Sequence, residues 1–149
     1  MTNIEELSRH KLSDLDECFA RYQNIDMDIA VAKELALQSD TQPDENIGGG
    51  RSSTISTPEQ RVVEQWEADN YLQELYRKRD ACKRAIDRMD NEQLAIYLYR
   101  YTSGNYHDWD DVGKHVGYVH SAIYRKRYAL LRLLAEELGE VPKHSVRTA

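Results

Sequence analysis

The chain has 149 residues, of which 31% are charged and 40% hydrophobic, and its formal net charge is −6. This length suits one domain, or one small domain with an appended arm, and the low mean hydropathy predicts modest cores between helices. No run of about 18 apolar residues occurs, so we expect no membrane span. The two cysteines, Cys18 and Cys82, lack C-x-x-C spacing and are predicted to be reduced thiols of a cytoplasmic protein.

A first helix is expected from about residue 3 to residue 38, because apolar residues recur there at steps of three and four while the opposite face is acidic. An apolar stripe of this kind needs another helix of the chain or a second copy to cover it. We therefore interpret region 1–38 as a helical arm for oligomerisation or partner binding. The stripe comprises Leu12, Leu15, Phe19, Tyr22, Ile25 and Ile29, with Ala32, Leu35 and Ala36 extending it.

Residues 39–57 lose this periodicity and are rich in glycine and serine, so they are predicted to form a flexible linker. The chain restarts at Thr57, which suits a helix N-cap followed by Pro58 at the first helical position and Gln60 in a capping box. A long central helix is expected to run from there to about Arg88. Its basic runs are predicted to form a solvated face paired with neighbouring acids.

A shorter helix is expected after Asp90 or Asn91, and Ser103-Gly104-Asn105 ends it. No strand-like alternation occurs, so the predicted fold class is all-α. The predicted architecture is a long N-terminal helix, a flexible Gly/Ser linker and a helical domain over residues 58–142.

The segment 108–138 has the pattern of a helix-turn-helix unit. Asp108 can cap a short apolar helix, Gly117 supplies a sharp turn, and a longer basic helix follows from about His120 to Leu138. Because Val119 offers no capping side chain, we expect packing of Tyr118 and Val119 to hold the turn.

This arrangement is typical of proteins that place the second helix in the major groove of duplex DNA. Although the chain is acidic, residues 118–149 carry six basic and three acidic side chains, so the local charge favours phosphate. The predicted base-reading side chains are His120, Ser121, Tyr124 and Arg125, with Arg125 the candidate for a bidentate guanine contact. The predicted phosphate-facing side chains are Lys126, Arg127, Tyr128 and Arg132, with Lys114 and Tyr118 beside the turn.

Two segments also resemble a known family. Asp44-Glu45-Asn46-Ile47-Gly48-Gly49-Gly50-Arg51 and, some eighty residues on, Leu134-Ala135-Glu136-Glu137-Leu138-Gly139 are similar to RinA-type phage transcriptional activators, which relate loosely to ArpU-type late regulators. Residues 109–138 resemble region four of bacterial sigma factors, from which Gly113 and Val119 depart. The resemblance implies a phage or prophage protein that activates late or packaging genes.

No enzyme is predicted. The paired carboxylates, such as Asp110 with Asp111, point apart on a helix, and no serine lies in a nucleophile-elbow setting. The five histidines show no metal-ligand spacing, so neither a metal nor a cofactor is expected.

The sequence thus predicts a DNA-binding transcriptional regulator whose remaining helices form homo-oligomers or contact host RNA polymerase. Two alternatives stay open: a small terminase-like packaging protein that forms rings on viral DNA, and a helical adaptor that binds only protein. Salt-dependent binding to duplex DNA would separate the adaptor from the other two.

Overall fold

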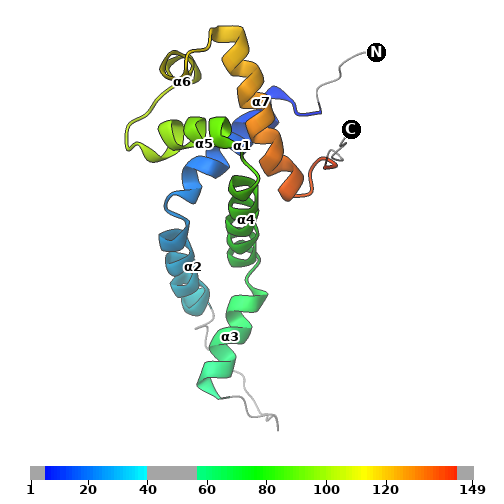
Figure 1. The fold of residues 1–149 in the computed structure, drawn as a ribbon. Helices are drawn as coiled ribbons and strands as arrows, with labels where there is room; N and C mark the ends of the chain where they lie inside the picture. Colours follow the sequence, from blue (N-terminus) through cyan, green and yellow to red (C-terminus); the bar gives the residue numbers. More distant parts are fainter. Residues whose placement is uncertain (1–5, 40–56, 144–149) are drawn as a thin grey trace. The chain divides into compact units, whose positions relative to one another are not determined.

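The computed structural model describes residues 6–39 and 57–143, and helices make up its regular structure (Figure 1). No strand occurs among these residues, which confirms the predicted all-α class. The predicted linker lies outside the described residues except at its two ends. The elements are α1 (Arg9–Tyr22), α2 (Ile25–Ser39), α3 (Pro58–Ala68), α4 (Asn70–Asp87), α5 (Asn91–Tyr97), the π-helical segment η1 (Leu98–Thr102), α6 (Trp109–Val116) and α7 (His120–Glu137).

The predicted N-terminal helix is in fact two helices, α1 and α2, separated at Gln23 and Asn24. The amide of Gln23 donates hydrogen bonds to the Phe19 carbonyl at 3.1 Å and to the Tyr97 hydroxyl at 2.7 Å. The carbonyl of Asn24 accepts the first backbone bonds of α2, from Met27 at 3.1 Å and from residue 28 at 3.0 Å. Side-chain bonding to a distant helix thus ends α1 without a proline or glycine.

The predicted central helix is also divided, between α3 and α4 at Asp69. The predicted capping box at its start is present, since Thr57 and Gln60 exchange hydrogen bonds of 3.0 and 3.1 Å. Asp69 has an extended backbone, and its carboxylate accepts a 2.8 Å bond from the Leu72 amide. Asp69 is therefore the N-cap residue of α4.

The contacts divide the chain into two units: residues 1–23 with 78–149, and residues 24–77. This division differs from the predicted boundaries of 1–38, 39–57 and 58–142. The first unit combines α1 with α5, α6 and α7, because α1 packs against α7. The second unit combines α2 with α3, and α4 contributes residues to both units.

The first unit has one hydrophobic core, in which the Phe19 ring packs edge-on to Tyr97 at 5.4 Å between centroids and also contacts Tyr101. Beside these rings the guanidinium of Arg100 and the hydroxyl of Tyr101 both bind the carboxylate of Asp16. In the last helix, the helical spacing of Ile123, Leu130, Leu131, Leu134 and Leu138 predicts an inward apolar stripe, and four of these five side chains are fully buried. These four are Ile123, Leu130, Leu131 and Leu134.

In the second unit, α2 packs on α3. The Trp66 indole donates a 3.1 Å hydrogen bond to the Lys33 carbonyl, while the Lys33 ammonium lies 4.7 Å from the centre of the same ring. The buried apolar side chains of this unit are Ile25, Ile29, Ala32, Ala36, Leu72 and Leu75.

Candidate nucleic-acid interface

The candidate interface is built on α6 and α7, which a short turn joins. The Asp108 carboxylate caps α6 by accepting a 2.8 Å bond from the Asp111 amide. At the other end, the carbonyl of Gly113 accepts hydrogen bonds from the amides of Gly117 at 2.8 Å and Tyr118 at 2.7 Å. Gly117 has φ of 90°, a left-handed conformation that glycine adopts at low cost. This bonding fixes the direction in which α7 begins.

The first turn of α7 has no side-chain cap. Val119 occupies the cap position and forms no capping hydrogen bond, because its side chain has no polar atom. The expectation that Val119 packs to hold the turn is wrong, because 72% of this residue is exposed. Two other contacts hold the turn. The Gly113 carbonyl accepts two backbone hydrogen bonds, and the Tyr118 hydroxyl donates to the carboxylate of Glu92 on α5.

A ring stack supports α6 from η1. The ring of Tyr99 lies between two histidines, with centroids 4.1 Å from His107 and 3.7 Å from His115. His115, in the last turn of α6, lies with its ring flat against the ring of Tyr99. The imidazole of His107 also contacts Asp111 in the first turn of α6. These contacts fix α6 and thereby the support of α7.

Four of the predicted site residues lie on the solvent side of α6 and α7. Ser121 and Arg125 are exposed on the first two turns of α7, whereas Ile123 between them is fully buried against α6. Lys114 is exposed on α6, and His120 is exposed with Nδ1 2.7 Å from an Asp110 carboxylate oxygen. The structure therefore presents a hydroxyl, a guanidinium, an ammonium and an imidazole at one end of this helix pair.

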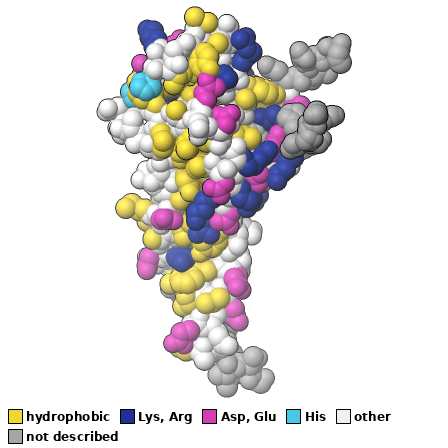
Figure 2. All heavy atoms as spheres, viewed as in Figure 1, with side chains coloured by type: hydrophobic (Ala, Val, Ile, Leu, Met, Phe, Trp, Pro, Cys, Tyr) yellow, Lys and Arg dark blue, Asp and Glu magenta, His cyan; other side chains and the backbone are white. Residues whose placement is uncertain are grey.

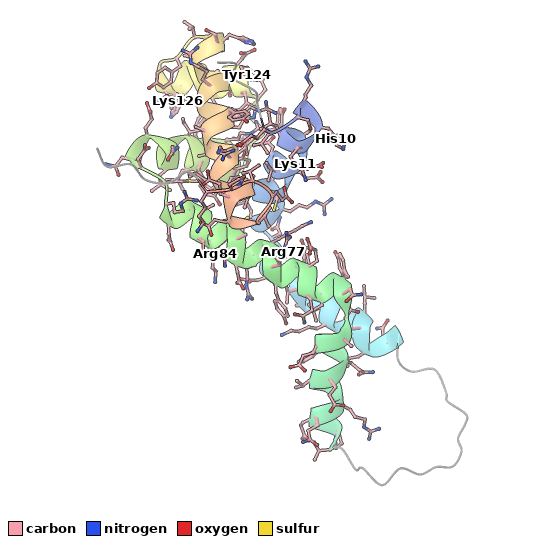
Figure 3. All side chains as sticks on the ribbon, turned by 90° about the vertical axis from the view of Figure 1, so that its right-hand side faces the viewer. His10, Lys11, Arg77, Arg84, Tyr124 and Lys126 are labelled. Carbon is pink, nitrogen blue, oxygen red and sulfur yellow. The ribbon has the colours of Figure 1, made fainter. Side chains whose placement is uncertain are left out.

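Tyr124 and Arg127 are half-buried and contact each other. The guanidinium carbon of Arg127 lies 5.6 Å from the centre of the Tyr124 ring, and the His120 ring lies 4.5 Å from it on centroids. Figure 3 labels Tyr124 and Lys126 on α7, each projecting from a different side of the helix. Tyr124 therefore shapes the exposed end of α7 and orients the two neighbouring polar groups.

Lys126 is engaged by a residue that sequence reasoning missed. Its ammonium lies 2.8 Å from a carboxylate oxygen of Glu92, which also accepts the Tyr118 hydroxyl bond. The hydrogen bond with Glu92 raises the pKa of Lys126, and the bonds from Lys126 and Tyr118 lower the pKa of Glu92. A glutamate in the first turn of a predicted helix gave no sign of this role, because its partners follow 26 and more residues later.

Two predicted phosphate-facing residues have internal partners instead. The Tyr128 hydroxyl accepts hydrogen bonds from the backbone amides of Glu6 at 2.9 Å and Leu7 at 3.2 Å. Arg132 is only 6% exposed, pairs with Glu6 and with Glu136 at 3.0 Å, and donates to a backbone carbonyl. The prediction that Arg132 contacts phosphate is therefore wrong: its charge neutralises a buried glutamate.

Two arginines in the basic runs of α4 pair with acids, one within α4, as predicted for a solvated face, and one on α7. Arg77 lies 3.0 Å from Glu74, and Arg84 lies 2.8 Å from Glu137 at the end of α7. In the space-filling view, basic and acidic side chains alternate over α4 and α7 (Figure 2). The Arg84–Glu137 pair links the end of α7 to α4.

In residues 6–39 and 57–143, no group of three or more histidine, cysteine or acidic side chains is arranged to hold a metal ion. Within the same ranges, no helix has both the length and the apolar character needed to cross a membrane.

The chain belongs to the family described as protein of unknown function (DUF722), whose model matches residues 11–136. The match begins in α1 and ends at the second-last residue of α7, so it includes all of α6 and nearly all of α7. Comparison with curated proteins and with solved structures gave no match.

Proposed function

We propose that this protein is a sequence-specific DNA-binding transcriptional regulator, and that α6 and α7 form its helix-turn-helix unit. The observation that carries the proposal is the division of α7 into two faces. Ile123 is fully buried, while Ser121 and Arg125 on the same turns are exposed. A helix fixed along one side by a shorter neighbour, with polar side chains on the other, suits the wide groove of B-form DNA.

Within this proposal, the exposed residues divide into two roles. In this proposal Arg125 forms a bidentate contact with a guanine edge, and Ser121 and His120 exchange hydrogen bonds with base edges. All three side chains are exposed. Lys114, Lys126 and Arg127 flank this face and supply charge for phosphate oxygens. Tyr124 and Tyr118 orient these cations rather than read sequence.

The biological setting rests on the resemblance of the sequence to RinA-type activators and to region four of sigma factors. On that basis the protein is a phage or prophage activator of late or packaging genes, which acts through host RNA polymerase without catalysing a reaction. Oligomerisation would place two or more α7 helices on successive turns of one DNA duplex.

The test begins with footprinting of the full-length protein on the genomic DNA that flanks its gene. Fluorescence anisotropy then measures affinity for the protected site and for an unrelated duplex. If about six phosphates are contacted, affinity should fall about a thousandfold between about 50 and 200 mM salt. No protected site, together with no salt-dependent binding to any duplex, would leave the protein-binding adaptor as the remaining class.

Two variants separate the proposed roles. Arg125→Ala should weaken binding to the protected site by about 1–3 kcal/mol and binding to the unrelated duplex much less. Arg127→Ala should weaken both to the same extent. Arg61→Ala, which removes an exposed arginine from α3, serves as the control for net charge and should change neither.

A further inference from the structure

Helix α2 exposes an apolar row that none of the described helices covers. Met27 is 68% exposed, Val31 53% and Leu35 54%, whereas Ile25, Ile29, Ala32 and Ala36 of the same helix are buried. Single exposed apolar residues are common on soluble proteins, but a contiguous row is a mark of an interaction surface. Figure 2 shows hydrophobic side chains at the surface over this unit.

The spacing of this row favours a helical partner. The three residues follow each other at intervals of four, so they form one of the ridges by which helices pack together. At about 100° per residue, the row lies roughly 140° around α2 from the buried face that includes Ile29 and Ala36. One face of α2 therefore packs within its own unit, while a second ridge is exposed.

Charge decides which helix fits. Asp28 and Glu34 lie about 60° to either side of Val31 on the helix, so both edges of the row carry an acid. The ammonium of Lys33, the one basic side chain of α2, lies over the Trp66 ring instead. A second copy of α2, parallel or antiparallel, would bring only carboxylates together along these edges, whereas a basic helix would pair with them.

We propose that this face of α2 is a docking site for an amphipathic helix of a partner protein, with an apolar stripe flanked by lysine or arginine. The apolar ridge enters the stripe of that helix, and Asp28 and Glu34 pair with its flanking cations. This site lies in the unit of residues 24–77 and does not depend on the proposed DNA contacts of α7.

The probe is a fluorescein-labelled peptide of about 15 leucine and lysine residues, with leucines at steps of three and four. There are two control peptides. One carries the same residues in scrambled order, and the other carries glutamate in place of each lysine. Anisotropy titrations use the full-length protein at about 150 mM salt. The basic amphipathic peptide should bind, and both controls should bind at least about tenfold more weakly.

Val31→Gln should weaken binding of the basic peptide about tenfold, because it removes the central apolar contact. Leu98→Gln, which changes another exposed leucine, is the matched control and should bind as wild type. Circular dichroism checks that each variant is folded, and DNA affinity of Val31→Gln should equal that of wild type.

Equal binding of all three peptides, or unchanged binding by Val31→Gln, would overturn the proposal. Sedimentation adds a further check: a dimer that Val31→Gln converts to monomer would assign the face to a second copy and also overturn it. Loss of DNA binding by Arg125→Ala with normal peptide binding would show that the α2 site does not depend on the DNA contacts of α7.

Discussion

Gly113 of α6 and Ile123 of α7 approach so closely that a Cβ atom on Gly113 would lie 3.1 Å from the Cβ of Ile123. The same added atom would lie 2.9 Å from the backbone oxygen of Tyr118. Glycine at position 113 therefore has a steric reason. Here the turn passes directly over the side of the shorter helix.

Gly113→Ala should lower the free energy of unfolding by about 1–3 kcal/mol, because backbone at Tyr118 and a buried side chain must move. This loss exceeds the roughly 0.5–1 kcal/mol that alanine normally adds inside a helix. Urea unfolding measures the change. Lys114→Ala, one exposed position along, controls for helix propensity; a Gly113→Ala protein as stable as wild type would contradict the packing described.

Arg132→Met should reduce stability rather than selectively reduce DNA affinity. Its guanidinium lies 3.0 Å from Glu136, whose side chain is only 2% exposed. Removing one member of a buried pair leaves an uncompensated charge, so we expect a loss of about 2 kcal/mol or more in urea unfolding. Arg61→Ala on the surface should cost less than about 0.5 kcal/mol. A stable Arg132→Met protein with lost DNA binding would reverse this assignment.

Glu92→Gln should strengthen binding to any duplex, if Lys126 contacts phosphate as proposed. The carboxylate of Glu92 now holds the Lys126 ammonium at 2.8 Å and competes with phosphate for it. Affinity should rise about two- to fivefold at low salt, and the difference should shrink as salt increases. Glu64→Gln on α3 controls for the loss of one negative charge. A fall in affinity would show that Glu92 chiefly positions Lys126 and Tyr118.

Acid should destabilise the contact between α4 and the end of α7. Burial opposes ionisation of Glu137, but hydrogen bonds from Arg84 and Lys143 lower its pKa overall. A lowered pKa contributes stability above the ordinary value of 4.5, and this stability is lost as pH falls through the folded-state pKa. Unfolding free energies from about pH 6 to pH 3 should therefore fall less for Glu137→Gln than for wild type. Identical pH profiles would rule out this contribution.

Cys18 should react with iodoacetamide before Cys82. The two Sγ atoms lie 3.9 Å apart, and the hydrogen bond with Cys18, together with burial, raises the pKa of the Cys82 thiol. Alkylation requires the thiolate, so the half-buried Cys18 should be labelled at least about tenfold faster in native protein. Mass spectrometry of peptides from timed samples measures both rates, and in urea they should converge. Faster labelling of Cys82 would contradict its burial.

Local signals in the sequence were sufficient for the parts of the fold that depend on neighbouring residues. The capping box of Thr57 with Gln60, the cap at Asp108 and the left-handed Gly117 all involve residues within a few positions of each other. The apolar period of α7 likewise marked its buried side, including Ile123 and Leu134. These features could be predicted because short-range hydrogen bonding and helical period determine them.

The remainder depends on contacts between distant segments. Nothing near Gln23 marks the end of α1, because the Tyr97 hydroxyl that binds it lies 74 residues later. Arg132 stands close to the basic run that begins at Arg125, so it resembled a surface cation, yet Glu6 meets it from 126 residues away. The residue pattern alone indicates which helix face is charged. It does not indicate which of these charges form ion pairs with a distant segment.

The interleaved order of the two units has a consequence for synthesis on the ribosome. Residues 24–77 form a contiguous stretch, so they can fold as soon as they emerge. The segment containing α1 emerges earlier but is part of the unit that also includes residues 78–149. The Tyr128 hydroxyl can accept the hydrogen bonds from the backbone amides of Glu6 and Leu7 only after α7 has been translated. The apolar side of α1 must therefore wait through most of translation, which makes the nascent chain a candidate client for a holding chaperone.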